Sequence, residues 1–269
     1  MKITHDLHIH THLSACCADK ETMRVPNIVA EAARLGLTTI GFSDHIWTNE
    51  AVPASDWYKL QNATHIAKLR REIEESGAAP LRISVGCEAD MRAPGEFSIT
   101  PDFAATLDHV LLACSHFHMR GFVEQPADTT PRAIGEHLIK FFISGVSSGL
   151  PTSIAHPFFP LGSIDRLDAI IASIPDSELS DTLSHAAAHN VALEITTCFI
   201  PGSNEQGNPV FSLDTPLRLL SLAKQAGCKF TFGSDAHSLS RLHVLSQLEF
   251  YIQALALDYD DMVIGEVSG

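Results

Sequence analysis

The sequence lacks the features of a disulfide-bonded, membrane-spanning or nucleic-acid-binding protein. Its six cysteines include no CxxC pair, which argues against a zinc ribbon and a thioredoxin-like redox site. No apolar run approaches the length of a membrane span, and the N-terminus MKITHDLHIH has no apolar signal region. The 18 Lys and Arg residues stand against 32 Asp and Glu residues, so we expect no basic surface for nucleic acid or an anionic membrane.

The remaining composition is that of an ordinary globular chain. Hydrophobic residues make up 45% of it and charged residues 19%, which is enough apolar surface to bury a core. Cys87, Cys114 and Cys228 lie in or beside apolar runs and are typical of buried free thiols, which suits a reducing cytoplasm. We expect one domain over residues 1–269, and the oligomeric state stays open.

Short apolar runs alternate with helical patterns along the chain. Alternating units of this kind predict a parallel sheet, and strands that are apolar almost throughout indicate a sheet covered on both faces. Seven units without an obvious linker favour a closed α/β barrel over an open sheet. The candidate strands are 2–10, 38–45, 81–90, 109–116, 152–157, 190–197 and 229–237, and the candidate helices are 25–36, 57–77, 131–149, 164–173, 177–189, 215–227 and 239–257. The segment 198–214, rich in Pro, Gly and Asn, is predicted to be a long loop.

Histidine is abundant, with 15 residues, and the stretch DLHIHTHLS places His8, His10 and His12 at alternate positions. Side chains two residues apart on a strand point to the same face. Other metal-ligating residue types also fall where predicted strands end, and in a parallel barrel these ends meet at one rim. They are Asp44 and His45, Glu88 in GCEAD, His116 and His118, His156 in IAHP, and Asp235 and His237 in GSDAH.

Each of these residues also has an ordinary structural explanation. Asp44 could cap the next helix, Glu88 could pair with Arg92, and IAHP could be a turn. One metal site nevertheless explains all of the positions together. Imidazole and carboxylate groups suit Zn, Fe or Mn, and the number of ligands implies two or three ions with Glu88 available as a bridge. Clustered metals polarise a phosphoryl or carbonyl oxygen and activate water, so the sequence predicts a hydrolase.

The motifs DLHIHTHLS, GFSDH, GCEAD, CSHFH, IAHP and GSDAH occur in the order found in the PHP (polymerase and histidinol phosphatase) family. The sequence resembles that family from residue 3 to about residue 240. The resemblance implies a distorted (β/α)7 TIM-like barrel with a two- or three-metal site at the C-terminal rim of the strands. The ligands that it implies are His8, His10, His45, Glu88, His116, His156, Asp235 and His237.

One position departs from the pattern of the family. Many members have a histidine six residues after the second histidine of the first motif, and others have an aspartate five residues after it; here these positions hold Cys16 and Ala15. Cys16 could be a thiolate ligand, Asp19 could take its place, or the third metal could be weak or missing. The pair Cys16 and Cys17 could also have no metal role. His12 and His118 are expected behind the ligands or in the wall of the pocket.

The leading prediction is a metal-dependent phosphoesterase, similar to histidinol phosphatases, that acts on a small phosphorylated molecule. A metal-bound hydroxide would attack phosphorus in line while the ions stabilise the charge on the equatorial oxygens. The catalytic group comprises His8, His10, Glu88, Asp235 and His237. Candidates for binding the phosphate are His118 and four arginines that follow motifs, Arg24, Arg92, Arg120 and Arg241, although each arginine could equally pair with a surface carboxylate.

Two alternatives stay open. The same metal site would serve a hydrolase of an amide or a cyclic diester. A non-catalytic, metal-stabilised scaffold is the second, but such a scaffold is expected to have lost ligands, and at least eight are intact here. A nuclease or proofreading role is less favoured because the net charge is -14.

Overall fold

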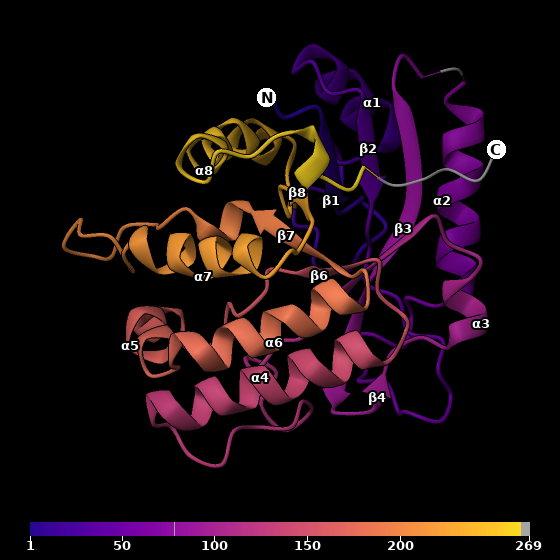
Figure 1. Ribbon diagram of the computed structural model, residues 1–269. Coiled ribbons are helices and arrows are strands. Elements are labelled where there is room, and N and C mark those ends of the chain that lie inside the picture. The colour runs from indigo at the N-terminus through magenta and orange to yellow at the C-terminus, as the bar shows by residue number, and fades with distance from the viewer. Residues whose placement is uncertain (78, 265–269) are drawn as a thin grey trace.

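The computed structural model describes residues 1–77 and 79–264, and its strands form a sheet that is nearly closed into a barrel (Figure 1). Seven parallel strands follow one another in chain order, which confirms the predicted parallel barrel. They are β1 (His5–Ile9), β2 (Thr39–Phe42), β3 (Arg82–Ala93), β5 (His109–Ala113), β6 (Ser153–Ala155), β7 (Ala192–Thr196) and β8 (Phe230–Gly233). The short strand β4 (Glu96–Phe97) pairs antiparallel with the end of β3.

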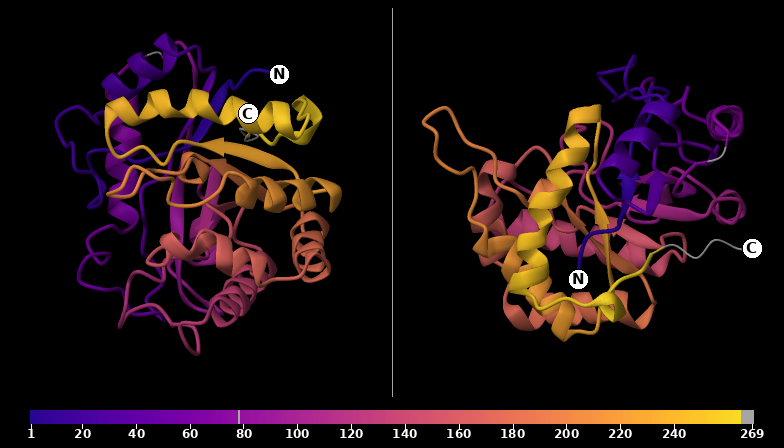
Figure 2. Two further views of the ribbon diagram at one scale, coloured as in Figure 1. Left: turned by 90° about the vertical axis from the view of Figure 1, so that its left-hand side faces the viewer. Right: turned by 90° about the horizontal axis from the view of Figure 1, so that it is seen from above.

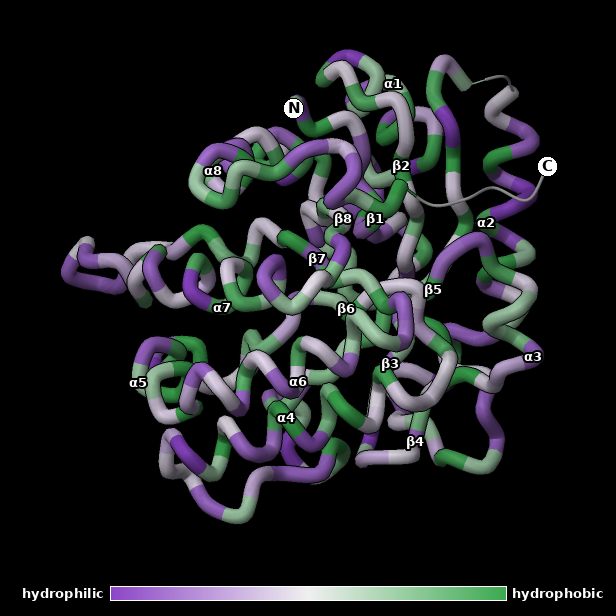
Figure 3. The backbone as a smooth tube through the Cα atoms, viewed as in Figure 1, coloured by the Kyte–Doolittle hydropathy of each residue, from purple (hydrophilic) through white to green (hydrophobic). Residues whose placement is uncertain are grey.

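Helices connect successive strands and surround the sheet (Figure 2). Hydrophobic and hydrophilic residues alternate along several of them, as expected when one face of a helix packs on a sheet (Figure 3). The α-helices are α1 (Val25–Arg34), α2 (Ala63–Glu75), α3 (Pro101–Ala104), α4 (Pro131–Ser147), α5 (Leu167–Ala172), α6 (Asp176–Ala188), α7 (Asp214–Gln225) and α8 (Glu249–Ala254). Short 3₁₀ segments are Ile164–Arg166, Thr197–Phe199 and Tyr259–Asp261. Of the helices in the described ranges, none has both the length and the apolar character needed to cross a bilayer.

The second helix starts later than the sequence predicts. The helical pattern begins at Trp57, but α2 begins at Ala63, because the side chain of Asn62 accepts a hydrogen bond from Thr64 N and caps the helix there. Residues 57–61 therefore stay in a turn, with Tyr58 buried and Trp57 partly exposed.

The closing helix also differs from the prediction, whereas 198–214 is a loop as expected apart from one short turn. The predicted closing helix 239–257 starts as a 3₁₀ segment, Leu239–Leu248, and becomes α-helical only at Glu249. The predicted loop 198–214 contains one 3₁₀ turn at its start and then extends from the body of the molecule (Figure 2). Helix α7 follows it directly from Asp214.

The barrel closes between β1 and β8 through a mixture of backbone and side-chain hydrogen bonds. His10 N donates to Ala236 O at 3.1 Å, where a parallel bridge joins Ile9 and Ala236. Deeper in the barrel, His5 Nε2 accepts from Phe232 N and Asp6 Oδ1 accepts from Ser234 N, both at 3.0 Å. Side chains of β1 thus replace part of the regular strand ladder, and this seam contributes to the distortion of the barrel.

The ring of His109, the first residue of β5, is buried among residues of β1, β2 and β3. Its Nε2 lies 2.8 Å from Ser43 Oγ and its Nδ1 lies 2.8 Å from Ser84 Oγ. Burial lowers the pKa of His109 to about 4, so the ring is neutral at pH 7. Two glycines leave room for this ring: a Cβ on Gly41 would lie 2.8 Å from its Cε1, and a Cβ on Gly86 would overlap both the ring and the carbonyl oxygen of His109.

We expect the substitution Gly86→Ala to destabilise the fold by about 1–3 kcal/mol, because the added methyl group overpacks the site occupied by the buried ring. Denaturant unfolding measures the change in the free energy of unfolding. Gly202→Ala is the matched control, since a Cβ there meets no atom within 4 Å. Equal stability of the two variants would contradict the role assigned to Gly86.

Candidate metal centre

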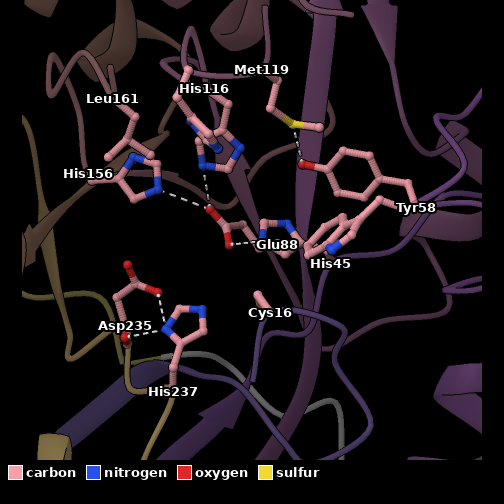
Figure 4. A pocket seen from close by; sticks show the side chains of 12 residues that line it. Cys16, His45, Tyr58, Glu88, His116, Met119, His156, Leu161, Asp235 and His237 are labelled. Atoms are coloured by element: carbon pink, nitrogen blue, oxygen red, sulfur yellow. Dashed lines mark hydrogen bonds and ion pairs between the residues drawn. The ribbon is translucent and has the colours of Figure 1, made fainter. Parts of the chain in front are cut away.

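A cavity of about 440 Å³ opens at the C-terminal rim of the strands (Figure 4). Most of the side chains around it come from strand ends or from the loops that follow them, which is where parallel α/β barrels carry their active sites. The lining residues are Cys16, His45, Trp57, Tyr58, Glu88, His116, His118, Met119, His156, Leu161, Asp235 and His237.

Glu88 lies at the centre of this cavity, among the rings of several histidines (Figure 4). The sequence-based expectation that the third strand ends at Glu88 is wrong, because β3 runs on to Ala93. The first part of β3 pairs with β2 as far as Val85, and the next part pairs with β5 from Gly86 to Asp90. This change of partner carries β3 across the rim and places Glu88 in the middle of the strand.

The carboxylate of Glu88 is 2% exposed and contacts five imidazole rings. Its Oε2 lies 3.2 Å from Nε2 of His8 and of His45, and 3.4 Å from Nε2 of His10; its Oε1 lies 3.0 Å from Nε2 of His156 and 3.5 Å from Nε2 of His116.

Three groups of side chains bring ligand atoms within 4.8 Å of one another, as a bound metal ion requires. Glu88 belongs to two of them, so it is placed to bridge two ions. All of the donors are imidazole nitrogens, carboxylate oxygens or a thiol sulfur, which suit Zn, Fe or Mn. The groups are His8, His10, Glu88 and Asp235; Glu88, His116 and His156; and His10, Cys16 and His45.

The arrangement of donor atoms fits cations. His8 Nε2 and His10 Nε2 face each other at 3.2 Å, and both lie within 3.5 Å of Asp235 Oδ1. Protons on both facing nitrogens would repel each other, whereas a divalent cation accepts both lone pairs and the carboxylate charge. Burial lowers the pKa of His8, but the carboxylates of Glu194, Glu88 and Asp235 outweigh this and raise it well above its ordinary value. The surroundings of His8 therefore favour positive charge, which a divalent cation would supply while the ring stays neutral.

Two buried carboxylates behind the histidines orient their rings. Asp90 accepts from His45 Nδ1 at 3.0 Å and from His116 Nδ1 at 2.7 Å. Glu194 Oε1 lies 2.7 Å from His8 Nδ1, and its Oε2 accepts from His156 N at 2.6 Å. When Nδ1–H is donated in this way, the Nε2 lone pair is left facing the cavity, as metal-ligating histidines require.

Asp90 and Glu194 are not among the site residues predicted from the sequence, although the position of each carries a signal. Asp90 lies two residues after Glu88, so on a strand it shares a face with it. Glu194 is the charged residue within the apolar strand β7, where an ionised group is costly unless it is paired.

Left-handed backbone conformations occur at two of the candidate ligands. His156 has φ 29° after β6, and Asp235 has φ 50° after β8. Such conformations are uncommon for residues with side chains and cluster at functional sites, where surrounding contacts hold them in place. At His156 the short hydrogen bond from its N–H to Glu194 supplies such a contact.

Cys16 reaches the cavity and lies beside the first histidine motif. Its Sγ is 3.5 Å from His10 Nδ1 and 3.0 Å from Ser14 Oγ. Burial raises the pKa of the thiol, but the adjacent His10, with hydrogen bonds from His10, His237 and His45, lowers it to about 3. The environment thus favours a thiolate, the form that binds metals.

The alternative ligand Asp19 does not line the cavity. Its carboxylate accepts hydrogen bonds from the N–H and hydroxyl of Thr22. Asp44 does not line the cavity either: it accepts from Thr11, contacts His65 Nε2 at 2.7 Å and lies 3.8 Å from His10 Nδ1.

Three further histidines named from the sequence occupy different positions. His237 lines the cavity and stacks on His10, with ring centroids 4.2 Å apart. His118 also lines it, next to His116. His12 points away, toward Glu72 at 3.5 Å.

The four candidate arginines do not converge on the cavity, and within residues 1–77 and 79–264 no Lys or Arg side chain lines it. Arg92 pairs with Glu96 at 2.6 Å, and Arg120 lines a separate depression. Arg24 lies 3.5 Å from His12 Nε2, and Arg241 lies 3.5 Å from Thr197 Oγ1.

The comparison with protein families identifies the fold. The PHP domain matches residues 6–199, which is most of the chain. This chain belongs to the PHP family. The family expected from the sequence motifs is thereby confirmed.

Two relatives found by sequence and one solved structure resemble the chain over most of its length. A probable phosphatase from Aliivibrio fischeri (strain MJ11) is 26% identical over 263 residues, covering 98% of this chain and 89% of the relative. A probable phosphatase from Vibrio atlanticus (strain LGP32) is 25% identical over 268 residues, covering 99% and 86%. The structure of histidinol phosphate phosphatase from Lactococcus lactis, complexed with zinc, L-histidinol and phosphate, has a TM-score of 0.56 at 19% identity and covers 92% of this chain and 94% of that one. This last likeness shows a shared fold.

We expect Asp90→Asn to weaken metal binding by about 10–100-fold, because an amide cannot accept from both His45 and His116. Titration of the metal-depleted protein with Zn²⁺ or Mn²⁺ measures the change. Tyr58→Phe is the control, since it removes the hydrogen bond from Tyr58 to Asp90 but leaves both histidine contacts in place. An affinity unchanged in Asp90→Asn would refute the orienting role.

Proposed function

We propose that this protein is a metal-dependent phosphoesterase that hydrolyses the phosphate ester of a small molecule. The observation that carries the proposal is the convergence of three donor groups on one cavity, two of them sharing Glu88. Membership of the PHP family and the relatives named as probable phosphatases support the same reaction.

The donor groups support two or three divalent ions of Zn, Fe or Mn. His8, His10, Glu88 and Asp235 would hold one ion, and Glu88, His116 and His156 a second. Cys16 and His45, with His10 or His237 beside them, would hold a third. When bound, clustered divalent ions act as Lewis acids and lower the pKa of a bound water to near neutral.

The protein's own part in this chemistry is to hold donors and exclude water. His8, His10, His156 and Glu88 are almost completely buried, so their positions are set by packing rather than by solvent. Asp90 and Glu194 fix which nitrogen of each ring faces the cavity. Pre-positioned ligands of this kind need little rearrangement during reaction, which is the main advantage an enzyme site has over water.

The charge of the cavity makes anion binding depend on the ions. Glu88 and Asp235 line it, Cys16 favours a thiolate, and no Lys or Arg side chain of the described ranges takes part. A phosphate group would meet repulsion there unless divalent cations reverse the local charge. We therefore assign phosphate binding to the metal centre rather than to Arg24, Arg92, Arg120 or Arg241.

Amide or cyclic-diester hydrolysis at the same site is the second candidate, because metal-activated water attacks these bonds as well. A non-catalytic scaffold is disfavoured, since all of the ligands implied by the family motifs lie around one cavity. The net charge of -14 gives no basis for a nucleic-acid substrate. The free state of all six cysteines is consistent with the cytoplasm as the proposed location.

Chelation is the direct test of the proposed function. We expect removal of metal to abolish hydrolysis of a panel of phosphate monoesters and to lower the melting temperature, because the clustered carboxylates lose their counter-charges. Zn²⁺, Mn²⁺ or Fe²⁺ should restore both. The same preparations are assayed on amides and cyclic diesters. Full phosphatase activity after exhaustive chelation, or hydrolysis of amides alone, would overturn the proposal.

The role of Cys16 is tested by counting ions in variants. If the thiolate holds the third ion, at about 2.3 Å for a zinc–sulfur bond, then Cys16→Ser should lose one ion per chain while Cys16→His retains the full number. The neighbouring Cys17→Ser is the control, since Cys17 is buried, does not line the cavity and has hydrogen bonds to the backbone oxygens of Asp19 and His237. Unchanged metal content in Cys16→Ser would remove Cys16 from the ligand set.

A further inference from the structure

The cavity has two walls of different chemistry. One is built from the metal-ligating side chains around Glu88. The other is built from Trp57, Tyr58 and Met119, none of which carries a charge; Tyr58 and Met119 are labelled in Figure 4. A volume of about 440 Å³ falls within the range of small-molecule sites, roughly 300–1,000 Å³. The apolar wall therefore has room to contact the organic part of a substrate whose phosphate lies at the other wall.

Packing holds the apolar wall in place. The ring of Tyr58 is 2% exposed and packs against Trp47, with ring centroids 5.2 Å apart. Its hydroxyl donates to Asp90 at 2.8 Å, so the wall is tied to the carboxylate that orients the ligand rings. The ring of Trp57 stands edge-on to that of Tyr58, with centroids 4.7 Å apart and an interplanar angle of 85°.

Trp57 lies at the mouth of the cavity with part of its surface uncovered. The centroid of its ring lies 5.7 Å from that of the candidate ligand His45, and Trp57 is 41% exposed. A large aromatic side chain left partly exposed beside a candidate active site can gain contact area when a ligand binds. Trp57 has this position because helix α2 is capped at Asn62 and begins only at Ala63, so Trp57 stays outside the helix.

The wall also offers no ion-pair partner for a charged substituent. The carboxylates of the cavity, Glu88 and Asp235, both belong to the metal-ligating groups, and among the described residues no Lys or Arg side chain lines it. An ammonium or carboxylate group on the organic part of the substrate would lose its hydration without gaining an ion pair. An uncharged ring has no such cost and gains contact with Trp57, Tyr58 and Met119.

We propose that the apolar wall, with Trp57 at its mouth, binds an uncharged aromatic leaving group, so that the substrate is the phosphate monoester of an alcohol or phenol carrying a flat ring. This proposal rests on the proposed phosphoesterase function. Hydrolysis breaks the bond between phosphorus and the ester oxygen, adds the oxygen of water to phosphorus and leaves a proton on the departing alcohol. The ring itself takes no part in the bond changes, so the preference is expressed in binding.

The test compares three phosphate monoesters of primary alcohols, which keeps the reacting bond the same: 2-phenylethyl, 2-hydroxyethyl and 2-aminoethyl phosphate. With the metal-loaded protein we expect kcat/KM for 2-phenylethyl phosphate to exceed that for the other two by about tenfold or more, through a lower KM. Equal or better hydrolysis of the hydroxyethyl or aminoethyl ester would overturn the assignment of an uncharged aromatic leaving group.

Substitutions then test whether Trp57 causes the preference for the phenylethyl ester. Trp57→Ala should raise KM for the phenylethyl ester about tenfold, with kcat and the hydroxyethyl ester little changed, and Trp57→Phe should restore most of the preference. Leu60→Ala is the matched control, since Leu60 lies in the same turn, is 78% exposed and does not line the cavity. If Trp57→Ala lowers hydrolysis of all three esters equally, or if Leu60→Ala has the same effect as Trp57→Ala, the wall has no role in specificity.

The two proposals fail in different ways. If none of the three esters releases phosphate with Zn²⁺, Mn²⁺ or Fe²⁺ present, the phosphoesterase function fails and the leaving-group assignment fails with it. If the esters are hydrolysed without preference for the ring, the function stands and only the assignment of the apolar wall is overturned.

Discussion

The structure is organised around one buried carboxylate. Glu88 has five imidazole nitrogens within 3.5 Å of its oxygens, supplied by residues from the first motif of the chain to His156. An ionised group in such a place is stable only with positive charge around it, and divalent cations would supply that charge while leaving the rings neutral. Three features position the side chains around it: the change of strand partner along β3, the left-handed conformations of His156 and Asp235, and the hydrogen bonds to Asp90.

The apolar wall and the metal-ligating wall are joined through the same side chains. Tyr58 donates to Asp90, and Asp90 in turn accepts from His45 and His116, so the aromatic packing around Tyr58 bears directly on the ligand rings. The two walls would therefore contact different parts of a substrate. Bound ions would determine where a phosphate lies, and the turn that carries Trp57 would determine what is attached to it.

The barrel and the rim were predictable because their signals are local. Most of the candidate histidines lie within three or four residues after a strand, His8 lies within β1, and parallel strands bring such positions together. The pairing of His8 with Glu194 was not predictable, since the two lie 186 residues apart and meet only across the closed barrel. The side chain of Arg92 pairs with Glu96 and does not line the cavity. Spacing along the chain does not reveal which of these two positions an arginine takes. The start of α2 was not predictable from the pattern, because the helical pattern begins at Trp57. In the structure residues 57–61 form a turn, and the helix begins only after Asn62.

Anomalous X-ray diffraction from crystals of protein that hydrolyses phosphate esters is the most direct test of the central claim, because it locates ions and identifies their elements. The account predicts two or three peaks in the cavity, two of them on either side of the Glu88 carboxylate, one beside His8, His10 and Asp235 and the other beside His116 and His156. Crystals of active protein with no metal peak next to Glu88 would contradict it.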